Sequence, residues 1–318
     1  MKNLSRLLIL LPGTIWGISF VAVELVLIDV QPITLTLLRS LISIVMLYAF
    51  LRYVGGELPK GFREWWPFFL LAAVNQAAPF ALVSWAQVTI EGGLASIYMA
   101  VMPLFTVILA AVFTKDEKLT VSKAVGAAVG LIGIVILIGP EVFSGLGKNV
   151  IAQLAVVLSS FLYAIGAIGT RFVYSLQPKN IKGWPLRLRI VASQFMMSIV
   201  MLVPVSLWLE DPFTTRPSVQ TWWLLIFLGV GVTGFAAVTY FYLIEELGAG
   251  AASMTIYIIP IAGVITGILV LGEQFRWQMG VALILILGGI AITNYGGQLG
   301  SRKIQPGRPA EGAKSGRV

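Results

Sequence analysis

Long apolar stretches, separated by short polar or Gly- and Pro-rich segments, make up most of this 318-residue chain. A helix needs roughly 20 mostly apolar residues to cross the hydrocarbon core of a bilayer, and ten stretches reach about that length. The segments between them are too short to form a water-soluble domain. The pattern therefore predicts an all-α integral membrane protein with ten transmembrane helices. The predicted spans are Leu7–Ile28, Ile33–Leu51, Trp66–Val88, Gly93–Phe113, Thr120–Gly139, Ile151–Thr170, Ile190–Leu209, Trp222–Ile244, Gly248–Leu271 and Trp277–Tyr295.

Composition narrows the chemistry that such a protein can perform. Apolar residues account for 58% of the chain and charged residues for 11%, which is typical of a polytopic membrane protein. The chain contains no Cys and no His, so disulfides, thiol catalysis and His metal sites are excluded. We expect neither a metal centre nor a cofactor. Any proton coupling must use carboxylates, because the side chain that most often shuttles protons near neutral pH is absent.

The basic residues lie mainly on one side of the predicted membrane. If the N-terminus is cytoplasmic, only Lys148, Arg216 and Arg276 fall in outer segments, and nearly all other Lys and Arg residues fall in cytoplasmic ones. This is the positive-inside bias, so the net charge of +8 indicates topology rather than nucleic-acid binding. We expect both termini in the cytoplasm and the protein in the cell inner membrane. The segment 296–318, rich in Gly, Pro, Lys and Arg, is predicted to be a disordered basic cytoplasmic tail.

An internal repeat relates the second half of the chain to the first. Gly93–Ser96 is followed by Pro103, and Gly250–Ser253 is followed at the same spacing by Pro260. Because each half holds an odd number of spans, the second copy enters the membrane upside down. Inverted repeats are a recurring plan of secondary transporters, with the substrate site between the halves near the midplane, although duplication can also serve stability alone. The predicted repeats are 1–147 and 148–295.

Pro103 and Pro260 lie in the middle of the two repeated spans. Each proline removes a backbone hydrogen bond and should kink its helix. The freed carbonyl groups could bind substrate, or the kink could act as a hinge during gating. A helix shape that is inherited without a function is the alternative.

Glu24 and Arg39 are charged residues inside predicted spans that are neighbours along the chain. At 1.5 Å per residue, both lie roughly 6–10 Å below the outer surface. A lone charge at depth costs about 2.5–3.5 kcal/mol on insertion scales, so we expect the two side chains to pair. The functional interpretation is an outer gate, or a site on Arg39 for a substrate carboxylate. The alternative is a static ion pair, or snorkelling of the charged groups toward the interface.

Other polar and aromatic side chains inside the spans are candidates for a substrate site. Asn75 and Gln76 lie near mid-membrane, where unpaired amides are costly, so they either bond neighbouring helices or face a wet cavity. Aromatic rings that line a cavity stack on planar substrates and offer a hydroxyl or indole N–H, although packing would also explain any one of them. The residues expected to contact the substrate are Trp16, Asn75, Gln76, Tyr98, Tyr163 and Tyr257.

An ordered set of motifs recurs in the two halves of the chain. The motifs are Trp16-Gly17, Pro32, Arg39, Gly93–Ser96 with Pro103, Glu117–Thr120, Gly126, Gly130, Gly133, Tyr163-Ala164 with Arg171, Ala252-Ser253 with Pro260, and Leu271–Glu273. This ordered set resembles the drug/metabolite transporter superfamily in its ten-helix EamA-type branch. The resemblance covers about 7–295 and implies two five-helix bundles around a central cavity. It also implies transport of small metabolites such as amino acids and nucleobases, often as export. The pair Phe275-Arg276 departs from the pattern, because the first copy has Leu119-Thr120 at the matching place.

We therefore predict a secondary transporter, not an enzyme, that moves small polar metabolites by alternating access. The expected substrates are amino acids or related compounds, and the expected direction is export. Its partners would be a small-molecule substrate and membrane lipid, with no nucleic acid, in a monomer or a homodimer. One alternative is an integral-membrane enzyme acting on lipid, which would usually show clustered catalytic side chains at a membrane face. The other is a non-transporting membrane scaffold, which would need larger extramembrane surfaces.

Overall fold

The computed structural model describes residues 8–113, 119–139, 148–247 and 254–301. Within these ranges every regular element is a helix, which confirms the all-α prediction. Three of the elements, labelled η, are π-helical turns inside longer helices. The elements are α2 Leu10–Val26, α3 Pro32–Tyr53, α4 Phe62–Ala72, η1 Ala73–Ala77, α5 Ala78–Ala86, α6 Gly92–Met99, α7 Met102–Phe113, α8 Val121–Ile138, α9 Lys148–Leu176, α10 Gly183–Leu209, α11 Val219–Ile226, η3 Phe227–Phe235, α12 Ala236–Leu247, α14 Thr255–Thr266, η4 Gly267–Leu271 and α15 Trp277–Ser301.

The structure contains eight helical segments that are long and apolar enough to cross a bilayer. Two shorter apolar helices, Leu10–Val26 and Thr255–Leu271, stand where the first and ninth spans were predicted. The described residues thus show eight full-length candidate spans and two shorter helices, where the sequence pattern predicted ten full spans. The multi-pass membrane architecture itself is confirmed.

Several helices continue beyond the ends predicted from hydropathy. Helix α9 runs to Leu176 rather than Thr170, and α10 begins at Gly183 rather than Ile190. Backbone hydrogen bonding does not require apolar side chains, so a helix can continue past the point where charged residues end the apolar stretch. Helix α15 likewise runs to Ser301, into the segment predicted as a tail, and residues 302–318 lie outside the described part of the chain.

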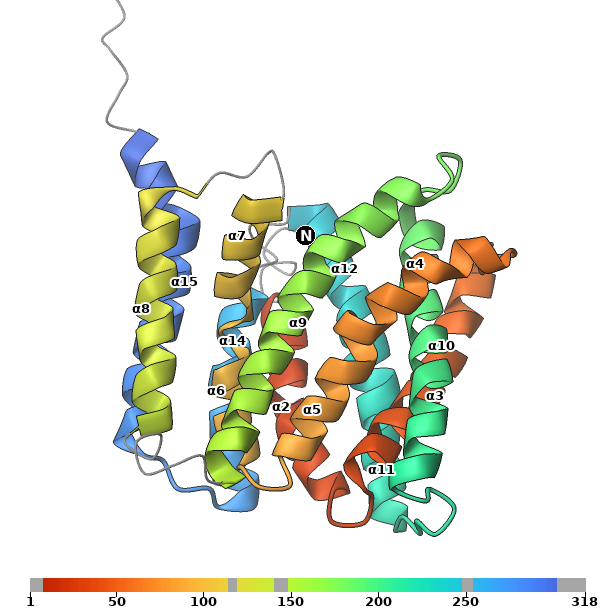
Figure 1. Ribbon diagram of the computed structural model, residues 1–318, viewed down its shortest axis with the longest axis horizontal. Coiled ribbons are helices and arrows are strands. Elements are labelled where there is room, and N and C mark those ends of the chain that lie inside the picture. Colours follow the sequence, from red (N-terminus) through yellow and green to blue (C-terminus); the bar gives the residue numbers. More distant parts are fainter. Residues whose placement is uncertain (1–7, 114–118, 140–147, 248–253, 302–318) are drawn as a thin grey trace, which may run out of the picture.

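The bundle is built by contacts between helices that are far apart in the sequence. Figure 1 shows α8 and α15 side by side at one edge, with α3 and α10 toward the opposite edge. In the centre α2 packs against α14, while α9 packs against α5, α6 and α7. Glycine allows a close approach at Gly17 of α2, where an added Cβ would lie 2.6 Å from the carbonyl oxygen of Ile259. Small residues at such interfaces let transmembrane helices meet backbone to backbone.

Candidate functional site

A cavity of about 460 Å³ lies in the centre of the bundle. Its walls come from α2, α3, η1, α5, α9, α10, η3, α12 and α14, and from the junction between α6 and α7. The size suits a small metabolite, and mostly apolar walls with a few convergent polar groups are typical of ligand sites. The lining residues with polar or aromatic-polar side chains are Trp16, Ser19, Arg39, Asn75, Gln76, Ser84, Gln87, Tyr163, Thr233 and Tyr240.

Two of the π-helical turns supply part of this wall. Asn75 and Gln76 belong to η1, and Thr233 belongs to η3. A π turn inserts an extra residue into the helix, and such bulges occur frequently at functional sites. No signal in the sequence indicates these two π-helical turns, since both lie inside stretches that the hydropathy pattern predicts as continuous helices.

The amide of Asn75 is held by a chain of hydrogen bonds. Its Nδ2 donates to Oε1 of Gln194 at 2.8 Å, and Nε2 of Gln194 donates to the carbonyl of Ile190 at 3.3 Å. The sequence left open whether Asn75 bonds a neighbouring helix or faces a cavity. In the structure Asn75 does both. Gln76 lies beside it, and its buried Oε1 has no hydrogen-bond partner among the described residues.

Trp16 and Tyr163, two of the residues expected to contact the substrate, both line the cavity. The indole N–H of Trp16 donates to the carbonyl of Val232 in η3 at 3.1 Å, and its ring lies 5.4 Å from that of Tyr240. The ring of Tyr163 meets Phe80 edge-on at 6.0 Å. These contacts hold aromatic side chains from both halves of the chain in the same wall.

The structure does not bring Glu24 and Arg39 into the expected ion pair. The Arg39 guanidinium lies over the ring of Phe80, 4.1 Å from its centroid, and Nε donates to Oγ1 of Thr233 at 3.3 Å. The carboxylate of Glu24 instead accepts a hydrogen bond from the backbone N–H of Gly92 at 2.6 Å. The first turn of a helix offers unpaired N–H groups and a positive dipole end, so it can hold a carboxylate in place of an arginine.

Glu24 belongs to a set of carboxylates that link helices at one end of the bundle, the lower end in Figure 1. Each accepts hydrogen bonds from backbone N–H groups at the start of another helix, and three of the contacts join one half of the chain to the other. The contacts are Glu24 to Gly92, Glu273 to Gly93, Glu210 to Ile33 and Thr34, and Asp29 to Ser218. In the sequence Glu273 stands out only among the residues that carry the family resemblance, and no signal there indicates Asp29 or Glu210.

Two of these carboxyl groups lie in loops and have displaced pKa values. Burial raises the pKa of Glu273 from 4.5 to about 7, although the Gly93 amide opposes the shift. The hydroxyl of Thr221 and the backbone N–H of Ser218 donate to Asp29 and lower its pKa. Glu273 would therefore change its charge near neutral pH.

Two of the predicted contact residues lie behind the cavity wall instead of in it. Tyr98 is fully buried in the largest apolar core cluster, with Leu104 among its members. Tyr257 packs against the same cluster, and its hydroxyl accepts a hydrogen bond from Nδ2 of Asn294 at 3.3 Å. Sequence position alone cannot separate the two faces of a helix that is apolar all round.

The two prolines affect their helices differently. Just before Pro103 the span is interrupted for two residues, because α6 ends at Met99 and α7 begins at Met102, and residues of this junction line the cavity. Helix α14 continues through Pro260. Since proline lacks an N–H, the carbonyl of Ile256 one turn earlier loses its usual donor, and Ile256 is part of the cavity wall.

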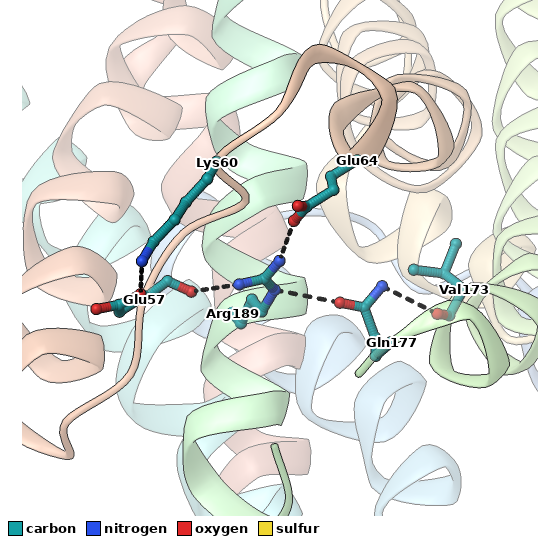
Figure 2. Close-up of polar contacts among 6 residues, drawn as sticks. All are labelled: Glu57, Lys60, Glu64, Val173, Gln177 and Arg189. Carbon is teal, nitrogen blue, oxygen red and sulfur yellow. Dashed lines mark hydrogen bonds and ion pairs between the residues drawn. The ribbon is translucent and has the colours of Figure 1, made fainter. Parts of the chain in front are cut away.

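A second buried arginine, which the sequence analysis placed in a loop, organises the opposite end of the bundle. Figure 2 shows that Arg189 uses all three of its side-chain nitrogens. NH2 pairs with the Glu64 carboxylate at 2.6 Å, NH1 donates to the Glu57 carbonyl at 3.0 Å and Nε donates to Oε1 of Gln177 at 3.2 Å. Arg189 thus ties α10 to α4, to the end of α9 and to the α3–α4 loop.

Comparisons with known proteins agree with this architecture. A model of the EamA-like transporter family matches residues 3–139 and 150–295. The uncharacterized transporter YoaV of Bacillus subtilis is 25% identical over 88% of this chain and 93% of its own. The uncharacterized inner membrane transporter YedA of Escherichia coli K12 is 25% identical over 89% of this chain and 88% of its own. A probable terminal-alkyne amino-acid exporter of Streptantibioticus cattleyicolor is 24% identical over 81% of this chain and 82% of its own.

One solved crystal structure superimposes with a TM-score of 0.64 and 18% identity, covering 91% of this chain and 96% of that chain. At this identity the likeness shows a shared fold alone. The names of the relatives denote membrane transporters, which disfavours the enzyme alternative. Because the family model matches almost the whole of both halves, this chain is a multi-pass integral membrane protein that belongs to the EamA-like transporter family.

Proposed function

We propose that this protein is a secondary transporter that moves small polar metabolites, amino acids or related compounds, by alternating access. The observation that carries the proposal is the central cavity of about 460 Å³, which is walled by helices of both halves of the chain. Within it Trp16 and Tyr163 offer ring faces, and Asn75 and Gln76 offer amides. These are the groups that would hold a small polar solute.

The pattern of helix contacts supports alternating access. If the spans are numbered along the chain, α2 belongs to the first span and α14 to the ninth, and these two helices are in contact. A shift by five spans relates this contact to that of α9, in the sixth span, with α6 and α7, in the fourth. The contacts of η3 and α12 with α2 correspond in the same way to those of η1 and α5 with α9. Two halves related by such an exchange, with one inverted, can swap conformations and so reach inward-open and outward-open states of similar energy.

The carboxylate contacts at one end of the bundle support a gate there. Glu24 and Glu273 hold the start of α6, and α6 leads into the junction just before Pro103 that lines the cavity. In the proposed topology this end is the outer one, because most Lys and Arg residues lie toward the other end and both termini are cytoplasmic. Tyr98, Tyr257 and Pro260 would act by supporting the wall and the bend of its helices.

The relative named as a probable amino-acid exporter supports amino acids as the substrate class and export as the direction. A scaffold is disfavoured because the cavity would then have no use. A lipid-modifying enzyme would have to change its substrate covalently, whereas a transporter releases it unchanged.

The test is uptake and efflux of an amino-acid and nucleobase panel by proteoliposomes, with and without a pH gradient. The expected result is saturable flux of one class of compound, recovered unmodified. Trp16→Ala should reduce that flux severalfold, because it removes a cavity wall, whereas Trp223→Ala should not, because Trp223 is 68% exposed on the outside of the bundle. Absence of flux for every compound, from protein shown to be folded, would contradict the proposal.

A further inference from the structure

The central cavity contains a single formal charge. Of the described residues that line it, Arg39 is the one with a charged side chain, and the side chain is 8% exposed. Removing a cation from water is costly unless a partner of opposite charge or good hydrogen-bond acceptors replace the water. The cavity is therefore suited to a ligand that brings a negative group, and a solute that carries only positive charge would be repelled.

The second buried arginine, Arg189, provides a comparison for the hydrogen bonding of Arg39. Arg189 is 5% exposed, nearly the same as Arg39, yet its three nitrogens all have protein acceptors and one of them pairs with Glu64 (Figure 2). Arg39 makes one hydrogen bond, from Nε to Thr233, and forms no ion pair with any described carboxylate. Its terminal NH1 and NH2 groups are the donors left for a ligand, since a guanidinium carries five N–H groups in a planar fork.

The surroundings of Arg39 hold this fork in position. The ring of Phe80, 4.1 Å away, covers one face of the guanidinium, and the Thr233 hydroxyl is itself anchored because it donates to the carbonyl of Leu228 at 3.0 Å. A guanidinium held in this way can form two parallel N–H···O bonds to a carboxylate, which an ammonium group cannot do. Trp16 and Tyr163 line the same cavity and could contact the rest of the molecule.

We propose that Arg39 is the binding site for the carboxylate of the transported molecule, so that the substrate is a carboxylate-bearing metabolite. The proposal rests on the proposed transport function and adds to it a specificity-determining residue. In this proposal Arg39 binds the substrate instead of forming an outer gate with Glu24. The Glu24 carboxylate already accepts a hydrogen bond from the backbone N–H at the start of α6. Carboxamides and decarboxylated amines of the same size, which lack the carboxylate, should be poor substrates.

The experiment compares transport of matched compounds by wild-type and variant protein in liposomes. The probes are the amino acid that gives the largest flux, its carboxamide and its decarboxylated amine. Wild type should favour the acid at least about tenfold, the effect expected from a charged hydrogen-bonded pair in a site shielded from water. Arg39→Gln should raise the half-saturating concentration of the acid at least about tenfold and abolish the preference, and Arg39→Lys should keep part of it.

The ratio of acid to amide flux separates binding from a structural role. If Arg39 only supports the fold, Arg39→Gln would lower the flux of acid and amide in proportion and leave the ratio unchanged, which would overturn the inference. If Arg39→Gln does not fold, Arg39→Lys serves in its place, and an unchanged ratio has the same meaning. Preference for an organic phosphate over every carboxylate would also overturn it. Failure of wild type to transport any compound would instead refute the proposed function.

Discussion

Glu273→Gln should make the stability of the protein less dependent on pH. Glu273 follows η4 in the loop before α15, is 8% exposed, and accepts two hydrogen-bond contacts from the N–H of Gly93, at 3.0 and 3.1 Å. Burial raises its pKa from 4.5 to about 7, and the carboxylates of Glu24 and Glu91 act in the same direction. The amides of Gly93 and Gly92 act against it but do not outweigh burial.

The sign of the effect follows from proton binding. Between pH 4.5 and about 7 the folded protein holds a proton on Glu273 and the unfolded chain does not. Raising the pH through this range therefore lowers the free energy of unfolding, which then stays at the lower value above about pH 7. At about 1.4 kcal/mol for each pH unit between the two pKa values, the loss is at most about 3 kcal/mol.

The assay is denaturant unfolding in detergent micelles, followed by tryptophan fluorescence at several pH values. Gln at position 273 retains a carbonyl oxygen for the Gly93 N–H but cannot ionise. Near pH 4.5 the variant and wild type should be equally stable, and above pH 7 the variant should be more stable by up to about 3 kcal/mol. Taking the difference between the two proteins removes the contribution of all other titrating groups.

A second variant controls for the loss of a capping carboxylate. Glu210 accepts hydrogen bonds from the N–H groups of Ile33 and Thr34 at the start of α3, at 2.8 and 2.6 Å. Glu210→Gln should destabilise the protein at pH 8, because a neutral acceptor forms weaker bonds than a carboxylate. If Glu273→Gln differs from wild type by the same amount at pH 5 and pH 8, the carboxyl does not titrate in this range and the burial argument is wrong.

Two further predictions concern contacts between helices: one tests close packing and the other tests the polar contacts of Arg189. Gly126→Ala should destabilise the protein by about 1–3 kcal/mol, because its Cβ would overlap a backbone carbonyl of α15, whereas Gly288→Ala, with nothing within 4 Å of its Cβ position, should not. Equal unfolding midpoints for these two variants would contradict the close approach of α8 and α15. Arg189→Gln should lower the free energy of unfolding by about 1–3 kcal/mol through loss of its contacts, the Glu64 pair among them. Arg189→Lys should recover only part of this loss, and full recovery would mean that charge alone matters there.

The class of this protein could be predicted from its sequence because the bilayer imposes a simple condition. Every backbone group in hydrocarbon must be bonded internally, so long apolar stretches have to form helices, and their number and spacing can be counted. The apolar stretch Pro32–Tyr53, for example, is one of the helices that the structure contains. The family could be recognised from the motifs around Trp16 and Tyr163, because a motif is local in sequence and can be identified without knowing which residues it contacts.

The partners of the polar residues inside the membrane were decided by tertiary structure. Arg39 was expected to pair with Glu24, only fifteen positions earlier, but it lies against Phe80 and Thr233, the latter 194 positions away. Glu24 meets Gly92, which is 68 positions away. Hydropathy carries no information about which helices become neighbours, so the local pairing was the wrong one.

The cavity depends on tertiary structure for a related reason. A helix that is apolar all round has no periodic signal to show which face meets lipid, which meets another helix and which meets a cavity. Asn75 and Trp16 proved to line the cavity, while Tyr98 proved to be core, although all three lie inside apolar spans by sequence. The sequence by itself determined that the chain forms apolar helices in a membrane. Which of their polar groups meet around a space large enough for a solute was decided by how those helices pack together.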